Sequence, residues 1–296
     1  MGERMKVLLI VNPAAGQLKA KTGLMDIVRR MNALGCLVTV VTTQRRSQAS
    51  ELVRELAADY DRLVCCGGDG TLNEVIAGLM QTEGPKELGY IPAGTTNDFA
   101  AGLGLSKDLG KAAEAAVCGL AHELDLGSFN GRYFSYVASF GMFSASSYSA
   151  PQAVKNIFGH AAYVMEGLKE LVNIKTYPVR QKADGRELEG EYIYGSVSNA
   201  TSIGGIVKLD PKLVDLRDGK FEVCLIKPPK SADSLTRLAM SLTSKHYDPE
   251  VMDFFQAREI RMELSEEQPW SLDGEYEEGV RQAEIKSLPR AIRMIY

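Results

Sequence analysis

Short apolar runs alternate with longer amphipathic segments over the first ~125 residues of the chain, and this alternation narrows the possible folds. The apolar runs are Lys6 to Val11, Leu37 to Val41, Arg62 to Cys66 and Leu88 to Ile91. The segments predicted as helices are Ala20 to Leu34, Gln48 to Ala58, Thr71 to Met80 and Lys107 to Gly119. In the second helix, Leu52, Val53 and Leu56 form one apolar face. Because a continuously apolar strand must be covered on both faces, the order predicts a parallel sheet with helices on each side.

The pattern changes near Asp125-Leu126-Gly127. From Arg132 onward, short runs rich in Tyr, Phe, Val and Ile alternate with Gly and Asp turns, which predicts an antiparallel β domain. Examples of these runs are Tyr192 to Ser198 and Lys220 to Ile226, and two helices are predicted at Gly159 to Asn173 and Ser231 to Lys245. We therefore expect a Rossmann-like α/β domain at residues 1–127, which residues 289–296 could rejoin, and a mostly antiparallel β-sandwich at 128–288.

Composition excludes several classes of protein. With 45% hydrophobic and 24% charged residues, the 296-residue chain can form a substantial core, and a net charge of -4 argues against a broadly basic nucleic-acid binder. No apolar stretch approaches the ~20 residues of a membrane helix, and the N-terminal run lacks a signal-peptide cleavage site, so we expect a cytoplasmic protein. None of the five cysteines forms a C-x-x-C pair, so buried free thiols are expected rather than disulfides or zinc.

The strongest local signal is the segment Gly67-Gly68-Asp69-Gly70-Thr71-Leu72-Asn73-Glu74, which follows an apolar run and opens a predicted helix. Consecutive glycines let backbone amides approach an anion, and the helix N-terminus adds partial positive charge, so phosphate is the expected guest. Asp69 would repel a phosphate unless a divalent cation such as Mg²⁺ lay between them. The alternative is a tight turn with Thr or Asp as the helix cap.

Two more turns follow apolar runs in the same way. Asn12-Pro13-Ala14-Ala15-Gly16 comes after the first run, at the position where open α/β sheets bind nucleotides. Ile91 to Ala100, with Gly94-Thr95-Thr96-Asn97-Asp98-Phe99, comes after the fourth. The Asn-Pro turn alone is as well explained by structure as by function. Because strand ends of a parallel sheet meet at one edge, the three turns are expected to converge.

In order and spacing, these three motifs resemble the catalytic domain of the diacylglycerol kinases, most closely the soluble bacterial lipid kinases. The resemblance continues through Asp125-Leu126-Gly127, Leu216-Arg217-Asp218-Gly219 and Leu272-Asp273-Gly274-Glu275, so it covers nearly the whole chain. Gly-Gly-Asp-Gly-Thr also occurs in NAD kinases and phosphofructokinases, whereas the Gly-Thr-Thr-Asn-Asp-Phe motif favours lipid kinases. The resemblance implies transfer of the γ-phosphate of ATP, with Mg²⁺, to a lipid hydroxyl, most simply that of diacylglycerol.

The resemblance also implies roles for particular residues. ATP would be held by Asn12, Pro13, Gly16, Thr43, Gly67, Gly68, Asp69, Gly70, Thr71, Asn73 and Thr95. Asp69 would hold the catalytic magnesium, and Glu275 would be the general base that takes the proton of the lipid hydroxyl. Asp125 could join them in an acidic cluster, where mutual repulsion raises proton affinity unless a metal offsets it. Without the resemblance, Glu275 would be interpreted as an exposed acid in a hairpin turn.

A second metal site is implied in the β domain. It resembles a structural magnesium site in which one carboxylate and two backbone carbonyls hold the ion, here from Asp218, Asp215 and Lys220. This chain departs from the family by an extra residue between Pro211 and Gly219, which affects the residues expected to supply the carbonyls. A plain turn is the alternative. In a further departure from the family, Ala101 stands where an arginine is usual after Asn-Asp-Phe-Ala.

The expected partner is a lipid at the membrane surface, contacted transiently by the second domain. The candidate docking segment is Lys155 to Lys175, which mixes apolar side chains with lysines; a helix packed on its own domain is the alternative. No nucleic-acid partner is expected, and a homodimer is left open. Two other functions compete with lipid phosphorylation: an NAD or sugar kinase with a soluble acceptor, and a non-catalytic nucleotide sensor.

Overall fold

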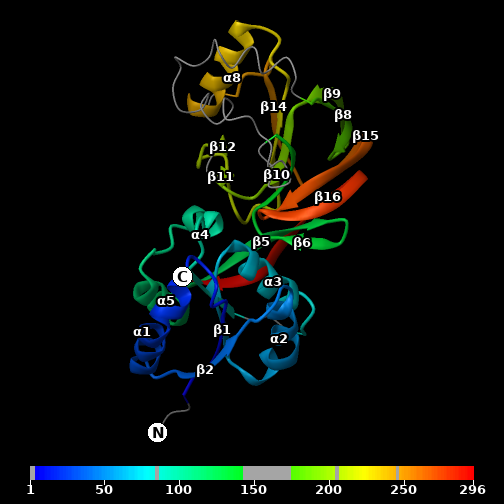
Figure 1. Cartoon of the computed structure of the whole chain (residues 1–296). Coiled ribbons are helices and arrows are strands. Elements are labelled where there is room, and N and C mark those ends of the chain that lie inside the picture. The colour runs from blue at the N-terminus through cyan, green and yellow to red at the C-terminus, as the bar shows by residue number, and fades with distance from the viewer. Residues whose placement is uncertain (1–3, 84–86, 143–174, 204–206, 245–246) are drawn as a thin grey trace. The chain divides into compact units, whose positions relative to one another are not determined.

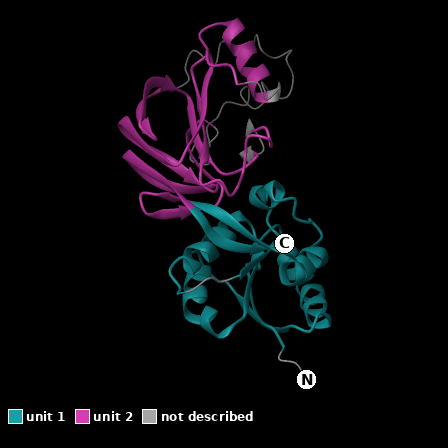
Figure 2. Ribbon diagram, turned by 180° about the vertical axis from the view of Figure 1, so that it is seen from behind, with its two compact units in different colours: residues 1–126, 289–296 teal, residues 127–288 magenta. Residues whose placement is uncertain are grey.

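The computed structural model describes residues 4–83, 87–142, 175–203, 207–244 and 247–296. Within them the chain divides into two compact units, each taken here by itself: Met1–Leu126 with Pro289–Tyr296, called unit 1, and Gly127–Leu288, called unit 2 (Figure 2). The predicted helix Gly159 to Asn173 lies outside the described residues.

Unit 1 is a parallel α/β sheet covered by helices (Figure 1). Its strands are β1 (Lys6–Val11), β2 (Leu37–Thr42), β3 (Arg62–Gly67), β4 (Glu87–Pro92) and the start of β5 (Ala121–Phe129). Its helices are α1 (Lys19–Ala33), α2 (Gln48–Leu56), the 3-10 turn Ala57–Asp59, α3 (Asp69–Leu79), α4 (Asp98–Gly102) and α5 (Leu109–Cys118). The sheet order is β2-β1-β3-β4, and the end of β16, Arg293–Ile295, pairs in parallel with β4.

Alternate residues of β1 show why this sheet is covered on both faces. Val7, Leu9 and Val11 pack in one core cluster with α1 and α5. Leu8 and Ile10 point to the opposite face and are equally inaccessible to solvent. On that second face α2 contacts α3, which contacts β3. The predicted parallel arrangement is confirmed, and Gly35 ends α1 with a left-handed backbone, φ 85°, as expected for a C-terminal cap.

Unit 2 is a mostly antiparallel β structure with one described helix. Its elements are β6 (Arg132–Phe134), β7 (Val137–Gly141), β8 (Tyr177–Ala183), β9 (Arg186–Tyr192), β10 (Tyr194–Ser198), β11 (Ser202–Ile203), β12 (Val207–Lys208), β13 (Phe221–Ile226), α8 (Ala232–Ser244), β14 (Met252–Ala257), β15 (Glu259–Leu272) and β16 (Glu275–Ile295). The neighbours run β14-β13-β10-β7-β15-β16, with β8 and β9 attached beside β15. In its core the ring of Trp270 lies 4.8 Å, centroid to centroid, from the ring of Phe129 and 4.8 Å from that of Phe140, tilted by 54° to each.

Several predicted boundaries are corrected by the structure. The helix predicted from Thr71 begins two residues earlier, at Asp69, and the helix predicted from Lys107 begins at Leu109, where the Asp108 side chain accepts a hydrogen bond from the N–H of Lys111. The short α4 was not expected. Of the cysteines, all of which are free, Cys118 is exposed rather than buried.

Candidate functional site

The three predicted turns of unit 1 meet at the carboxyl ends of β1, β3 and β4. The N–H of Asn12 donates to the carbonyl of Cys66 at 2.9 Å, and the N–H of Ala93 donates to the carbonyl of Gly67 at 2.8 Å. The side-chain amide of Asn12 donates to the hydroxyl of Thr71 at 3.0 Å. The predicted convergence is therefore confirmed by direct hydrogen bonds that join the first turn to the second and the second to the third.

Glycine is needed at two of these contacts for reasons of space. A Cβ on Gly16, whose φ is 56°, would lie 1.9 Å from the carbonyl oxygen of Ala93. A Cβ on Gly94 would lie 2.5 Å from the Cα of Gly68. Any side chain at either position would push the turns apart, so these glycines hold the turns close together, a role in addition to any approach to an anion.

The second turn ends in the N-terminus of α3, the best candidate for binding phosphate. Gly68 is the N-terminal cap residue of α3 and has an extended backbone. No side chain at the cap accepts a hydrogen bond from an N–H group in the first helical turn of α3. The sequence alternative of a capping Thr or Asp for α3 is therefore wrong. Thr71 and Asn73 are buried in the helix. Amides and helix dipole are thus presented at one end of the sheet, as anion binding requires.

Asp69 forms a contact that the sequence did not reveal. Its carboxylate accepts hydrogen bonds from the N–H of Asp98 at 3.0 Å and the N–H of Phe99 at 3.4 Å. It therefore caps the N-terminus of α4 and ties the second turn to the third. Asp98 is itself buried, and this burial raises the pKa of its carboxyl. Ala101, at the position of the usual arginine, lies exposed on this short helix.

Two further side chains, Glu74 and Asn97, hold the turns in place through hydrogen bonds. The sequence analysis gave neither of them a role. Glu74 accepts from the N–H of Ser47 at 2.7 Å and of Ala49 at 3.2 Å, and so fixes the segment after β2. Asn97 exchanges two hydrogen bonds with the backbone of Gly94, at 2.8 and 2.9 Å. Glu74 belongs to the second motif and could have been singled out from the sequence. The N–H groups that it binds belong to Ser47 and Ala49, in another loop, so its role could not.

The remaining predicted nucleotide residues lie at the ends of neighbouring strands. Thr43 follows β2, and its N–H donates to the carbonyl of Val11 at 2.9 Å. Thr95 is exposed in the third turn, and Pro13 is half-buried in the first. Their contact with a nucleotide stays a prediction.

Asp125 holds the returning C-terminal segment of unit 1. It is buried in β5, and its carboxylate accepts a hydrogen bond from the N–H of Arg290 at 2.7 Å. Arg290 has a left-handed backbone, φ 51°, which this bond helps to hold. The contact gives Asp125 an architectural role, and the acidic cluster expected around it stays a prediction.

Glu275 opens β16, directly after the two-residue turn Asp273-Gly274, in which both residues have positive φ, 51° and 84°. This is the turn geometry that suits the twist of a β-hairpin. Glu275 is half-buried. Asp273 is buried, and its carboxylate accepts four hydrogen bonds: from Ser135 N–H (2.6 Å) and Oγ–H (2.7 Å), and from the N–H groups of Tyr136 (2.9 Å) and Val137 (3.0 Å). Burial raises the pKa of Asp273, and these bonds oppose the shift.

The residues proposed for the structural metal site form local turns. The carboxylate of Asp218 accepts from the N–H of Lys220 at 2.9 Å, and that of Asp215 accepts from the N–H of Arg217 at 3.1 Å. Gly219, between Asp218 and Lys220, has φ 74°. Within the described ranges, no group of three or more His, Cys, Asp or Glu side chains is arranged to hold a metal ion. The plain-turn alternative accounts for this geometry, and metal binding here stays a prediction.

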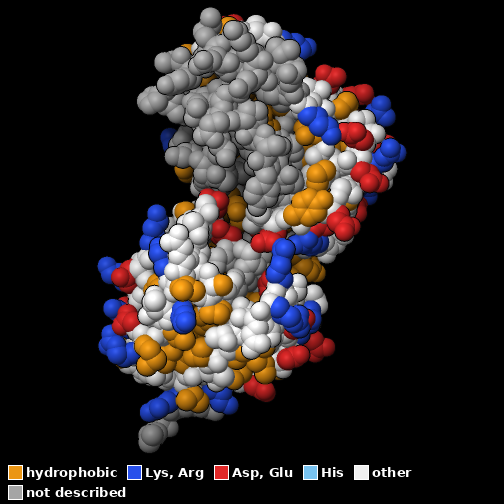
Figure 3. Space-filling model, in the orientation of Figure 1, with side chains coloured by type: hydrophobic (Ala, Val, Ile, Leu, Met, Phe, Trp, Pro, Cys, Tyr) orange, Lys and Arg blue, Asp and Glu red, His pale blue; other side chains and the backbone are white. Residues whose placement is uncertain are grey.

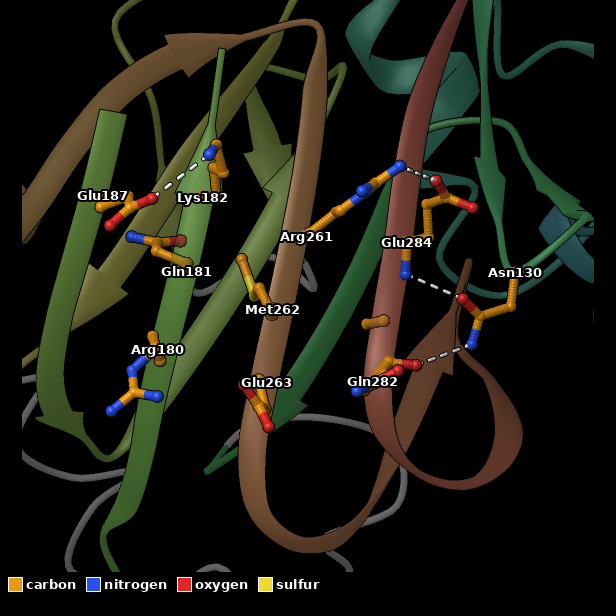
Figure 4. Close-up of a pocket in the computed structure, with 11 residues that line it drawn as sticks. Asn130, Arg180, Gln181, Lys182, Glu187, Arg261, Met262, Glu263, Gln282 and Glu284 are labelled. Carbon is orange, nitrogen blue, oxygen red and sulfur yellow. Dashed lines mark hydrogen bonds and ion pairs between the residues drawn. The ribbon is translucent and has the colours of Figure 1, made fainter. Parts of the chain in front are cut away.

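Unit 2 also has a surface cavity of about 690 Å³ on the strands β8, β15 and β16 (Figure 4). Two ion pairs lie within the wall, Lys182 with Glu187 at 3.2 Å and Arg261 with Glu284 at 3.0 Å, and Arg180 pairs with Glu189 outside the lining at 3.3 Å. Asn130 bonds the backbone of β16. None of the predicted site residues lines it. Because its cations are ion-paired and its charges are of mixed sign, the cavity is a weak candidate for phosphate binding.

Similarity to known proteins agrees with this geometry. Residues 6–129 match the diacylglycerol kinase catalytic domain, and residues 137–296 match the YegS C-terminal NAD kinase beta sandwich-like domain. The diacylglycerol kinase of Bacillus subtilis (strain 168) is 32% identical over 289 residues, which cover 97% of this chain and 95% of that protein.

The chain belongs to the diacylglycerol kinase family.

The diacylglycerol kinase of Staphylococcus carnosus (strain TM300) is 30% identical over 92% of this chain and 89% of that protein. A crystal structure of a diacylglycerol kinase from Bacillus anthracis str. Sterne covers 100% of this chain and 98% of its own, with a TM-score of 0.77 at 26% identity. The resemblance and the fold class inferred from sequence are thus confirmed, and the chain is a kinase of this family. Among the described residues, no helix has the length and apolar character needed to cross a bilayer.

Proposed function

We propose that this kinase transfers the γ-phosphate of ATP to the hydroxyl of a membrane lipid, and that diacylglycerol is the acceptor, giving phosphatidic acid. The observation that carries the proposal is the meeting of three glycine-containing turns at the carboxyl ends of β1, β3 and β4, around the uncapped N-terminus of α3. An α/β sheet binds nucleotides at this position. The names of the relatives favour a lipid acceptor.

In this proposal the amides of the α3 N-terminus and the turn after β1 hold the phosphates of ATP, while Glu275 accepts the proton of the lipid hydroxyl. The hydroxyl oxygen forms the new bond to the γ-phosphorus, the bond from that phosphorus to the β-bridging oxygen breaks, and ADP leaves. Phosphoryl transfer requires little covalent assistance, so positioning supplies most of the acceleration. A positioned base adds about 10²–10⁴-fold.

Magnesium is the expected counter-ion, and Asp69 is the residue that would hold it in unit 1. An ionised carboxylate can accept about four hydrogen bonds or metal contacts in all, so accepting two backbone N–H groups is compatible with a further contact to a metal or its water. When bound, the ion neutralises charge that develops on the transferred phosphate. This site fits the ion chemically, since hard oxygen ligands are what Mg²⁺ prefers.

Contact with the membrane is proposed to be transient and to involve unit 2. Of the candidate segment 155–175, residues 155–174 lie outside the described residues. Lys175 forms an ion pair with Glu266 at 2.5 Å and lies 5.2 Å above the ring of Tyr177.

The deciding experiment supplies purified protein with γ-labelled ATP and separate acceptors: micellar diacylglycerol, ceramide, sphingosine, NAD and a sugar. We expect labelled phosphatidic acid, and loss of the signal when EDTA removes divalent cations. Transfer to NAD or sugar without lipid would establish a soluble-acceptor kinase. Absence of transfer to every acceptor, with ATP binding retained, would favour a nucleotide sensor.

A further inference from the structure

Acidic side chains of unit 1 typically lie at the surface and close to cations. Figure 3 shows them on its visible face, next to Lys and Arg side chains. Asp26, for example, forms ion pairs with Arg29 at 2.7 Å and with Arg30 at 2.8 Å. Asp98, the first residue of α4, has neither feature. It is 8% exposed, and within the described residues its side chain forms no hydrogen bond and no ion pair.

The capping of α4 does not account for this buried acid. An acidic residue at the start of a helix usually accepts hydrogen bonds from N–H groups of the first turn. Here the N–H groups of Asp98 and Phe99 both donate to the carboxylate of Asp69, at 3.0 and 3.4 Å. The N–H of Ala101 donates to the carbonyl of Asn97 at 3.0 Å. Asp69 therefore caps the helix, and the carboxyl group of Asp98 remains available for another partner.

The backbone on both sides of Asp98 is fixed. The side chain of Asn97 exchanges two hydrogen bonds with the backbone of Gly94, at 2.8 and 2.9 Å, and Phe99 is buried. The backbone nitrogen of Asp98 lies 3.0 Å from a carboxylate oxygen of Asp69. Because an aspartate side chain is short, the carboxyl group of Asp98 is confined to the junction of the second and third turns. Two acids held at one junction repel each other unless a cation lies close to both.

We propose that Asp98 is a second carboxylate ligand, direct or through water, for the divalent cation that accompanies ATP. The inference rests on the Mg²⁺–ATP site proposed above, in which Asp69 is the first carboxylate. In kinase sites Mg²⁺ is bound by one or two carboxylates together with phosphate oxygens, and it keeps several waters. Buried charges in proteins are ordinarily paired or coordinate a metal. A cation at this junction supplies the partner that Asp98 lacks and offsets the repulsion between the two acids.

Binding of Mn²⁺, used in place of Mg²⁺, tests the proposal without any lipid. Free Mn²⁺ is measured by electron paramagnetic resonance in the presence of a non-hydrolysable ATP analogue. We expect Asp98→Asn and Asp69→Asn each to raise the Kd of Mn²⁺ by about tenfold or more, because an uncharged amide is a weaker ligand. Asp59→Asn removes the same charge at an exposed position of unit 1 and should leave that Kd unchanged. A Kd that rises in Asp69→Asn but not in Asp98→Asn would overturn this inference and leave the role proposed for Asp69 intact.

Thermal melts distinguish a metal ligand from an acid that supports the fold. Without metal and nucleotide, Asp98→Asn should melt at or above the wild-type temperature, because the neutral amide removes a buried charge that has no partner. The rise in melting temperature on adding Mn²⁺ and the nucleotide analogue should be smaller than in the wild type. A metal-free melting temperature several degrees below that of the wild type would show that Asp98 holds the fold, and would overturn the proposal. If Asp98→Asn loses Mn²⁺ binding while the wild type phosphorylates no lipid, the proposed acceptor is wrong and this inference is supported.

Discussion

Asp69 in unit 1 and Asp273 in unit 2 both lie in glycine-containing turns, and both carboxylates accept backbone N–H groups. They differ in burial and in the groups that they hold: Asp69 is half-buried and accepts N–H groups at the start of α4, whereas Asp273 is buried and accepts from Ser135, Tyr136 and Val137. In the proposed mechanism, Asp273 of unit 2 holds the backbone of the turn and Glu275 accepts the proton. In unit 1, Asp69 alone both holds the backbone of α4 and binds the magnesium ion. Substitutions should therefore separate stability from turnover in unit 2 and change both in unit 1.

The largest expected effect is on turnover at Glu275. Glutamine keeps the shape of glutamate but cannot take up the proton, so Glu275→Gln should lower turnover on micellar lipid by about 10²–10⁴-fold. Its melting temperature and its binding of ATP with magnesium should stay close to those of the wild type, because the shape of the side chain is kept and Asp273 still holds the turn through its bonds to Ser135, Tyr136 and Val137. Wild-type turnover with an unchanged melt would place the base elsewhere, and Asp125 would be tested next.

The next largest effect is expected at Asp69, where both turnover and melting temperature should fall. In Asp69→Asn, one of the two N–H donors of α4 would face an amide NH₂ group in place of an oxygen. We expect turnover to fall about 10²-fold, as small displacements of positioned groups allow, together with a melting temperature lower by a few degrees. Initial rates at several magnesium concentrations, alongside thermal melts, give both quantities. Near-normal turnover at ordinary magnesium concentration would remove Asp69 from the mechanism.

The third effect, at Asp273, should be mainly on stability. Asp273→Asn leaves buried donors of Ser135 or Val137 without an acceptor, which should lower the free energy of unfolding by about 2–3 kcal/mol. Ser135→Ala is the milder match, since it removes only the hydroxyl donor. Urea titration of both variants gives the two values. If Asp273→Asn lost most of its turnover while its free energy of unfolding stayed at the wild-type value, Asp273 would act in the chemistry. The contrast drawn here between Asp273 and Asp69 would then be wrong.

The smallest effect is expected at Asn12. Asn12→Ala removes the bond to Thr71 and the bond from the N–H of Ala14 to the Asn12 side chain, at 3.0 Å. Each is worth about 1 kcal/mol. Because this loosens the first turn without touching the acids, we expect a several-fold rise in the KM for ATP and little change in turnover. An unchanged KM would place the nucleotide away from this turn.

The sequence by itself determined the class of fold and the meeting of the three turns at one end of the unit 1 sheet. Runs such as Lys6 to Val11 are apolar at every position but the first because both faces of their strand are buried, so local composition carries the information. Convergence of the three turns followed from the rule that parallel strands end at one edge of a sheet, and the bond between Asn12 and Thr71 confirms it.

Only the tertiary structure decided what the acids do. Asp69 meets its partner N–H groups 29 and 30 positions away, Asp273 meets its own 136 to 138 positions away, and Asp125 meets Arg290 across 165. The short α4 was missed for the same reason, since five residues form a weak helix alone and the cap comes from another turn. In sequence, each acid is only a carboxylate beside glycines or apolar residues. Whether it holds backbone or remains available for chemistry depends on which distant N–H groups the fold brings to it.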